Sequence, residues 1–179
     1  SMRERFETQV DFLEGHSDVG LVGTATDIID ESGRVVDRRH VLESPSVDDL
    51  LEHNHYIHGS VMMRRNAVEE VGGYDETFEY TEDYDLWLRI ADEYAVRNID
   101  EFLYALRLRS DSIYGSKLYD VKLWELFAKK RFMRDIDDEL RARIDSHDDV
   151  TPLYESLSCL EQIHLHREIG KELLRYHEF

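Results

Sequence analysis

The sequence predicts an α/β domain followed by a helical extension, and three observations support this. Up to residue 115, runs rich in Val, Ile and Thr alternate with short helical patterns that begin at Ser, Asn or Thr and end at Gly. From Ser116 onward, apolar residues recur at helical spacing without any strand pattern. No linker rich in Pro, Gly or Ser joins the two parts. We therefore expect an α/β core over residues 1–115 and helices over 116–179, packed on the core or on a second copy of the chain.

The first elements follow from local signals. Arg5 to Glu14 carries Phe6, Val10 and Leu13 at helical spacing, and Gly15 ends the pattern, so a short amphipathic helix is expected.

A hairpin is expected next. Val19 to Ile29 is rich in Val, Ile and Thr and predicts a buried strand. Asp30 to Gly33 is a turn sequence, and Arg34 to Arg39 predicts a shorter, exposed strand that pairs with the first.

Three short elements follow the hairpin. Ser46 is placed to cap a helix that runs through Leu51, with acids in its first turn. Tyr56 to Arg64 predicts a strand. Asn66 then caps a helix over Ala67 to Val71, which the glycine pair that follows it ends.

An acidic stretch lies at the centre of the sequence. The paired-glycine turn feeds a loop, and Thr81 is placed to cap a helix with three acids in its first five residues. At 100° per residue Asp83 shares a face with Trp87, whereas Asp85 and Arg89 fall on the opposite face. We expect Asp83 to point toward the core and Asp85 to form a solvated pair with Arg89. A carboxylate at the rim of an apolar face is either a helix-start acid or a candidate general base.

The remaining pattern changes from strand to helix. Residues 95–109 predict a strand, or two strands joined by a turn. Three helical stripes follow, and the third, from Leu153 to Tyr176, includes Leu157, Leu160, Ile163 and Leu173. The first two consist of Leu118, Val121, Leu123, Trp124, Phe127 and Ala128, and of Ile136, Leu140 and Ile144.

The charge balance excludes some classes of partner. Forty acidic residues against 22 basic ones give a net charge of -18, which argues against nucleic acid or an anionic membrane as the main partner. The basic residues are 17 Arg and 5 Lys, and an acid excess with few Lys indicates adaptation to high salt. A localised acidic binding surface is the competing interpretation, although the acids are spread along the whole chain. We expect a halophilic, acidic cytoplasmic protein.

The lone cysteine and the apolar runs add two expectations. Cys159 cannot form a disulfide within the chain and is expected to be a buried packing residue. No apolar run approaches the roughly 20 residues that a transmembrane helix needs, and no signal-type segment opens the sequence.

Several motifs in order resemble those of family 2 glycosyltransferases, the inverting enzymes with the GT-A fold. The central one is Gly72-Gly73-Tyr74-Asp75-Glu76 followed by Glu82-Asp83-Tyr84-Asp85-Leu86-Trp87-Leu88-Arg89. The others are Arg5-Phe6-Glu7-Thr8-Gln9, Val19-Gly20-Leu21-Val22-Gly23-Thr24, His58-Gly59-Ser60-Val61-Met62, Leu103-Tyr104 and Arg107. The resemblance covers roughly Arg3 to Lys117, so residues 1–115 are expected to be the acceptor-side half of a GT-A domain.

The resemblance implies transfer of a sugar from a nucleotide-diphosphate donor to an acceptor hydroxyl with inversion. Asp83 stands where the family has its general base, and Glu82 is expected to orient the loop or an acceptor hydroxyl. Gly73, Tyr74 and Trp87 are candidates for acceptor binding. We expect Trp87 and most of the tyrosines to be core residues rather than platforms on which a sugar stacks. Tyr74 is the exception, because its place in the glycine loop would let it contact an acceptor.

The chain departs from the family pattern in two places. The family holds a divalent metal, Mg²⁺ or Mn²⁺, on an Asp-X-Asp motif just before the segment that matches Arg5 to Gln9, and that motif and the nucleotide-binding half are missing. The chain is therefore expected to be inactive alone and to bind no metal. Many relatives have a histidine at the position of Arg109, so Arg109 and Arg107 are either diphosphate-binding residues or surface bases.

Two further sequence patterns bear on function. His53, His55 and His58 invite a zinc site but lack an i,i+4 helical pair and a nearby cysteine. A Gln-X-X-Arg-Trp motif is also missing, which favours transfer of a single sugar over processive synthesis. The leading alternative function is a non-catalytic binding or dimerisation module with a glycosyltransferase-like core. In either case the helices over residues 116–179 offer a surface for a homodimer.

Overall fold

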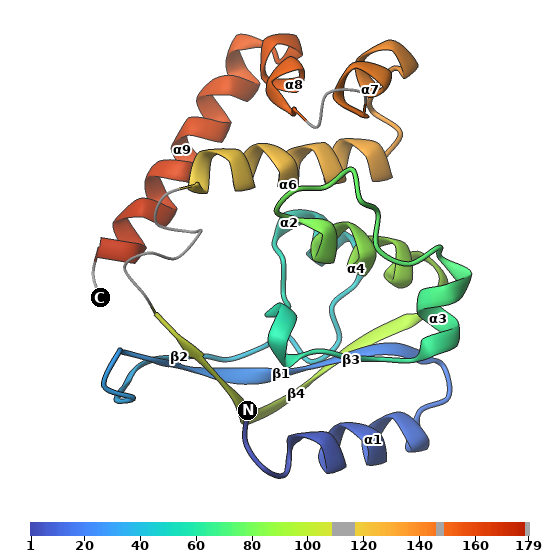
Figure 1. Cartoon of the computed structure of the whole chain (residues 1–179), viewed down its shortest axis with the longest axis vertical. Helices are drawn as coiled ribbons and strands as arrows, with labels where there is room; N and C mark the ends of the chain where they lie inside the picture. Colours follow the sequence, from blue (N-terminus) through green and yellow to red (C-terminus); the bar gives the residue numbers. More distant parts are fainter. Residues whose placement is uncertain (109–116, 146–148, 178–179) are drawn as a thin grey trace. The chain divides into compact units, whose positions relative to one another are not determined.

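The computed structural model describes residues 1–108, 117–145 and 149–177, with side chains up to residue 174 (Figure 1). These residues group into two compact units. One contains 1–73 and 86–108, and the other contains 74–85 with the described residues beyond 116. The boundary expected between residues 115 and 116 stays a prediction, and this grouping adds that 74–85 associates with the C-terminal helices.

A mixed four-stranded sheet forms the first unit (Figure 1). Strand β1 (Val19–Ile29) lies at its centre and pairs in parallel with β4 (Ala95–Arg107) along one edge. Its other edge pairs antiparallel with β3 (Met62–Met63) and then with β2 (Val35–Arg39). All of β1 except its last residue is buried, as its continuous apolar run predicts. The expected buried strand and hairpin are confirmed.

Helix α1 (Arg5–Gly15) is confirmed, and Leu13 of the predicted stripe is buried, but Arg5 and Gln9 form the rest of its buried face. Phe6 and Val10 are 59% and 42% exposed, while Gln9 is fully buried. The Gln9 side-chain amide donates to the carbonyls of Val22 and Ser60, at 3.0 and 2.8 Å. A polar residue therefore lies at the centre of this face because it satisfies two buried backbone acceptors.

The short elements after the hairpin are partly as expected. Helix α2 (Val47–Glu52) has the predicted Ser46 cap, with the reciprocal bonds of a capping box. The strand expected over Tyr56 to Arg64 is mostly wrong, since a 3₁₀ turn, η1 (His58–Ser60), precedes the two residues of β3. Helix α3 (Arg65–Glu70) begins before Asn66, so Asn66 is not its cap.

Helix α4 (Glu82–Glu93) is buried on more than one face. Its residues at consecutive positions from Tyr84 to Leu88 are at most 3% exposed. Trp87 and Ile90 of the predicted core face are buried, and Asp92 is exposed as expected, but Asp85, which was expected on the solvent side, is buried.

The second unit contains four helices in the part of the chain that the structure describes (Figure 1). They are α6 (Leu118–Phe132), α7 (Asp138–Asp145), α8 (Thr151–Ser156) and α9 (Cys159–His177). Helix α6 packs against α8 and α9, and α7 packs against α8. All six apolar residues predicted for the α6 stripe are buried, and the residues described beyond 116 contain no strand.

The third predicted stripe needs correction. Ser158 interrupts it by starting a new helix: the Ser158 hydroxyl accepts from the backbone N–H of Glu161, and the Glu161 carboxylate accepts from the backbone N–H of Ser158. Leu165 and Ile169 face the core of the unit, whereas Leu160 and Ile163 are 78% and 59% exposed. Cys159 is exposed as well, so its expected burial is wrong. No described helix is both long enough and apolar enough to cross a membrane.

Candidate functional site

The paired-glycine turn has the backbone conformation that glycine favours. Gly72 and Gly73 adopt φ angles of 89° and 73°, in the left-handed region. Arg89 holds this turn, since its guanidinium donates to the carbonyls of Val71 and Gly73, at 2.6 and 2.8 Å. Arg89 therefore braces the turn by backbone contacts, as part of the unit that contains the sheet.

Three of the predicted site residues lie together in the second unit. Glu82 and Asp83 are half-buried in the first turn of α4, and Tyr74 is 43% exposed. Burial, and then the charges of Asp83 and Glu82, raise the pKa of the Tyr74 phenol, so its hydroxyl lies within electrostatic reach of both carboxylates. One oxygen of Asp83 accepts from the backbone N–H of Tyr84 at 2.7 Å. The arrangement puts two acids and a phenol at one partly open site.

Asp85 has a different environment from the one expected. Its side chain is 4% exposed and accepts from Arg131 of α6 at 2.8 Å. Arg131 also donates to Asp75 at 2.8 Å. Burial opposes ionisation of Asp75, but hydrogen bonds from Thr77 and Arg131 outweigh it and lower its pKa to about 2. The expected solvent exposure of Asp85 is wrong, because its carboxylate is buried in an ion pair with Arg131, 46 residues away.

Thr81 does not cap α4 through its side chain. Its hydroxyl is buried and has no hydrogen-bond partner among the described residues. The Thr81 carbonyl instead accepts the backbone N–H of Asp85 at 3.0 Å. The acids of the first turn therefore carry more of the interaction with the free N–H groups at this helix end.

Trp87 is fully buried. Its ring meets those of Tyr56 and His58 edge-on, with centroids 6.2 and 5.8 Å away. It therefore has no exposed face on which a sugar could stack, and its burial agrees with the interpretation of Trp87 as a core residue.

Arg107, one of the two candidate diphosphate-binding arginines, is the last residue of β4. Arg107 is exposed, and its guanidinium donates to the carbonyls of Asp30 and Glu31 in the hairpin turn, at 2.8 and 2.7 Å. These bonds use one nitrogen, Nη1, of the five-donor fork. Arg109 lies outside the described residues.

No group of three or more His, Cys, Asp or Glu in the described ranges is arranged to hold a metal ion. The rings of His53 and His55 are 6.5 Å apart, and that of His58 lies against Trp87. Burial lowers the pKa of His55, because desolvation disfavours the charged imidazolium. The described residues therefore do not fit the divalent metal that the resemblance implies.

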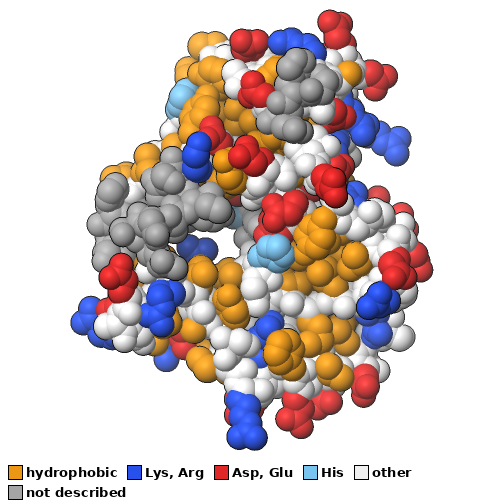
Figure 2. All heavy atoms as spheres, in the orientation of Figure 1, with side chains coloured by type: hydrophobic (Ala, Val, Ile, Leu, Met, Phe, Trp, Pro, Cys, Tyr) orange, Lys and Arg blue, Asp and Glu red, His pale blue; other side chains and the backbone are white. Residues whose placement is uncertain are grey.

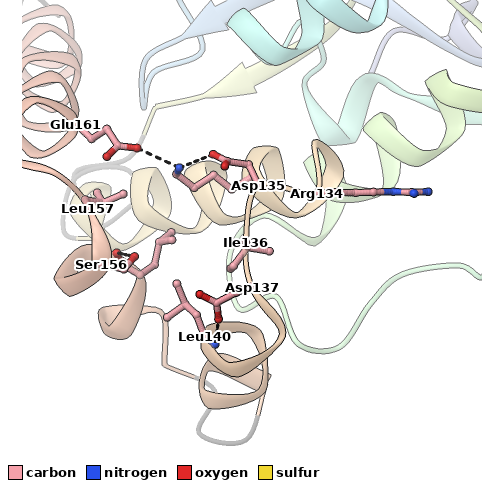
Figure 3. Close-up of a pocket in the computed structure, with 10 residues that line it drawn as sticks. Arg134, Asp135, Ile136, Asp137, Leu140, Ser156, Leu157 and Glu161 are labelled. Carbon is pink, nitrogen blue, oxygen red and sulfur yellow. Dashed lines mark hydrogen bonds and ion pairs between the residues drawn. The ribbon is translucent and has the colours of Figure 1, made fainter.

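The hollow between α6, α7, α8 and α9 is a second feature of the C-terminal unit (Figure 3). Lys130 lies in it between Asp135 and Glu161, at 2.7 and 3.1 Å. Hydrogen bonds from Ser158, and then from Lys130, lower the pKa of Glu161 to about 2. The charge of Lys130 is therefore matched by two acids.

Comparison with known protein families assigns most of the chain, including the acidic site, to one family. The family model described as "Glycosyltransferase like family 2" matches residues 21–137. The match therefore includes α6 and extends about 20 residues past the range over which the motifs resemble the family.

Curated relatives give the same assignment. The amylovoran biosynthesis glycosyltransferase AmsE of Erwinia amylovora is 34% identical over 62% of this chain and 42% of its own length. The putative glycosyltransferase EpsE of Bacillus subtilis is 36% identical over 63% of this chain and 41% of its own. The O-antigen biosynthesis glycosyltransferase WbnJ of Escherichia coli is 30% identical over 73% and 54%. The chain spans about half the length of the curated relatives it matches, and it belongs to glycosyltransferase family 2.

Proposed function

We propose that this chain is the acceptor-side part of an enzyme that transfers one sugar from a nucleotide-diphosphate sugar to an acceptor hydroxyl with inversion. One observation carries the proposal. Within the region matched by the family, the half-buried pair Glu82 and Asp83 opens α4 beside the partly exposed Tyr74. Saccharide or lipid-linked molecules are the acceptor classes that we propose.

Asp83 is the general base in this proposal. The acceptor oxygen attacks the anomeric carbon, the bond from that carbon to the diphosphate oxygen breaks, and the diphosphate leaves with the bonding electron pair. The acceptor proton passes to the Asp83 carboxylate. The amino end of α4 favours the ionised carboxylate that this role requires.

Neighbouring residues orient the reactants. Glu82 accepts a hydrogen bond from an acceptor hydroxyl, and Tyr74 offers its phenol and the edge of its ring at the same site. Gly73 precedes Tyr74 in the sequence, and its φ of 73° is a conformation that residues with a side chain rarely adopt. Arg107, and Arg109 by sequence, would pair with diphosphate oxygens. A divalent metal belongs to the proposal for the complete enzyme, but no step here depends on it, since the described residues do not fit one.

The proposal assigns donor binding to a longer polypeptide. The relatives are roughly twice as long as the part that this chain matches. We expect the chain alone to show neither transfer nor binding of nucleotide sugars by calorimetry, and we expect a version extended at its amino end to show both. Tight donor binding by the chain alone would contradict this assignment.

The substitution that tests the base is Asp83→Asn in the extended polypeptide. Asn keeps the size of the side chain and most of its capping capacity but cannot take the proton, so kcat should fall about a hundredfold or more with donor affinity unchanged. Asp92→Asn is the matched control, because Asp92 is an exposed acid of the same helix. If both variants turn over like the parent, Asp83 is only a helix-start acid.

A dimerisation role is the second candidate function. Leu160, Ile163 and Leu174 of α9 are 78%, 59% and 70% exposed and fall on one side of the helix at 100° per residue. Such a stripe suits contact with a second copy of the chain. Light scattering should give twice the mass of one chain, and Ile163→Glu should restore the monomer. A monomeric parent chain would remove this candidate.

We also propose that the protein works in a salt-rich cytoplasm. The net charge of -18 is carried by Asp and Glu side chains that are scattered over the face seen in Figure 2. This dispersal favours salt adaptation over a localised acidic binding surface, and the assays above are best made in molar salt.

A further inference from the structure

Arg131 joins two acids that are far from it in the sequence. Its two terminal nitrogens each donate at 2.8 Å, Nη1 to Asp75 and Nη2 to Asp85. The side chain of Arg131 is 14% exposed and that of Asp85 is 4% exposed. Because water screens this pair weakly, its geometry is held more tightly than that of an ordinary surface ion pair.

The two acids lie at the two ends of the acidic loop. Asp75 follows the glycine pair, and Asp85 lies in the first turn of α4. Between them, Phe78 places its ring under the guanidinium, 4.5 Å from the Arg131 Cζ atom, and packs against Phe127 of α6 at 5.4 Å. One arginine of α6 therefore holds the loop at its start, its middle and its end.

This contact bears on the proposed base through helix geometry. Asp83 and Asp85 are two residues apart in α4, and at 100° per residue their side chains leave opposite sides of the helix. When Arg131 holds Asp85, the first turn can no longer rotate freely about its axis. Asp83 is then directed away from α6.

We propose that Arg131 is a positioning residue for the acidic site, and that α6 acts as a brace for the loop over residues 75–85. This inference rests on the proposed function only for its catalytic consequence. Arg131 itself touches neither acceptor nor donor in this proposal. It acts by fixing the direction of the turn that carries Asp83.

Hydrogen exchange in the chain as it stands tests the brace without an activity assay. Arg131→Gln should speed exchange of the loop amides at residues 76–85 by at least about tenfold and leave β1 unchanged. The matched control is Arg143→Gln, which removes the same charge from an exposed pair with Glu155 on α7 and α8. Asp75→Asn, which leaves the pair with Asp85, should give a smaller change in the same amides. Unchanged loop exchange would overturn the proposal, and so would an increase spread evenly over α6, α8 and α9.

Transfer assays in the extended polypeptide test the catalytic consequence. Arg131→Gln should lower kcat about tenfold to a hundredfold with little change in the KM for the donor. It should add little to the loss caused by Asp83→Asn, because a misdirected base and a missing base fail at the same step. Fully additive losses would assign Arg131 to stability alone. If Asp83→Asn has no effect, the proposed function fails, whereas the exchange data still decide whether the brace exists.

Discussion

Asp85→Asn should strongly destabilise the C-terminal unit, although a solvent-facing acid at this position would be nearly neutral. Removing one partner of a buried ion pair costs about 3–5 kcal/mol. Two features reduce this cost here. Arg131 keeps Asp75 as a partner, and the Asn carbonyl can still accept one hydrogen bond from the guanidinium. We therefore expect a loss of about 2–3 kcal/mol in the free energy of unfolding.

Thermal and urea unfolding followed by circular dichroism at helical wavelengths would measure this loss. A unit of this size should melt about 10–20 °C lower for a loss of that order. Asp92→Asn provides the baseline and should stay within about 0.5 kcal/mol of the parent, since it changes the same charge on an exposed turn of α4. If Asp85→Asn also stays within that range, the ion pair with Arg131 does not stabilise the protein and the reasoning on the brace loses its basis.

Three further predictions concern pH, salt and the glycine turn. The pKa values of Asp75 and Glu161 are lowered to about 2, so the stability that these two carboxylates give the folded chain is complete above pH 4.5 and lost between pH 4.5 and 2. An acid titration of unfolding should show this loss, and the double variant Asp75→Asn with Glu161→Gln should flatten it. The melting temperature should rise from dilute buffer to molar salt, because a net charge of -18 repels itself when unscreened, and a flat response would favour a localised acidic surface. Gly72→Ala should lower the free energy of unfolding in urea by about 1–2 kcal/mol through backbone strain alone, since no atom lies within 4 Å of the added Cβ. Gly15→Ala is the control and should cost nothing, because Gly15 also has open space but no positive φ.

Elements with a local signal could be predicted from the sequence. The run of Val, Ile and Thr in β1 is buried on both faces of the sheet, and the Ser46 box satisfies the first N–H groups of α2 within four residues. The apolar stripe of α6 was also predicted correctly. In each case the residues that decide the structure are neighbours in the chain.

Features that depend on distant partners could not be predicted in this way. The burial of Asp85 requires Arg131, which lies 46 residues away, and no pattern around either residue indicates the other. Gln9 is buried because carbonyls of β1 and η1 need a donor, and this need is not apparent in the sequence of α1. The acids Glu82 and Asp83 could be selected by motif, but the proximity of Tyr74 to both became apparent only in the structure.

The parallel pairing of β1 with β4 also affects how the chain is made. The strands β2 and β3, three α-helices and the acidic loop lie between β1 and β4 in the sequence, so β4 leaves the ribosome about 80 residues after β1. Because the ribosome adds roughly 5–20 residues per second, one edge of β1 keeps its backbone groups unpaired for several seconds. During this time β2 and β3 can cover only the opposite edge. The nascent chain is therefore most open to aggregation along the β4 side of β1, and a chaperone that shields this edge would protect the slowest step of its folding.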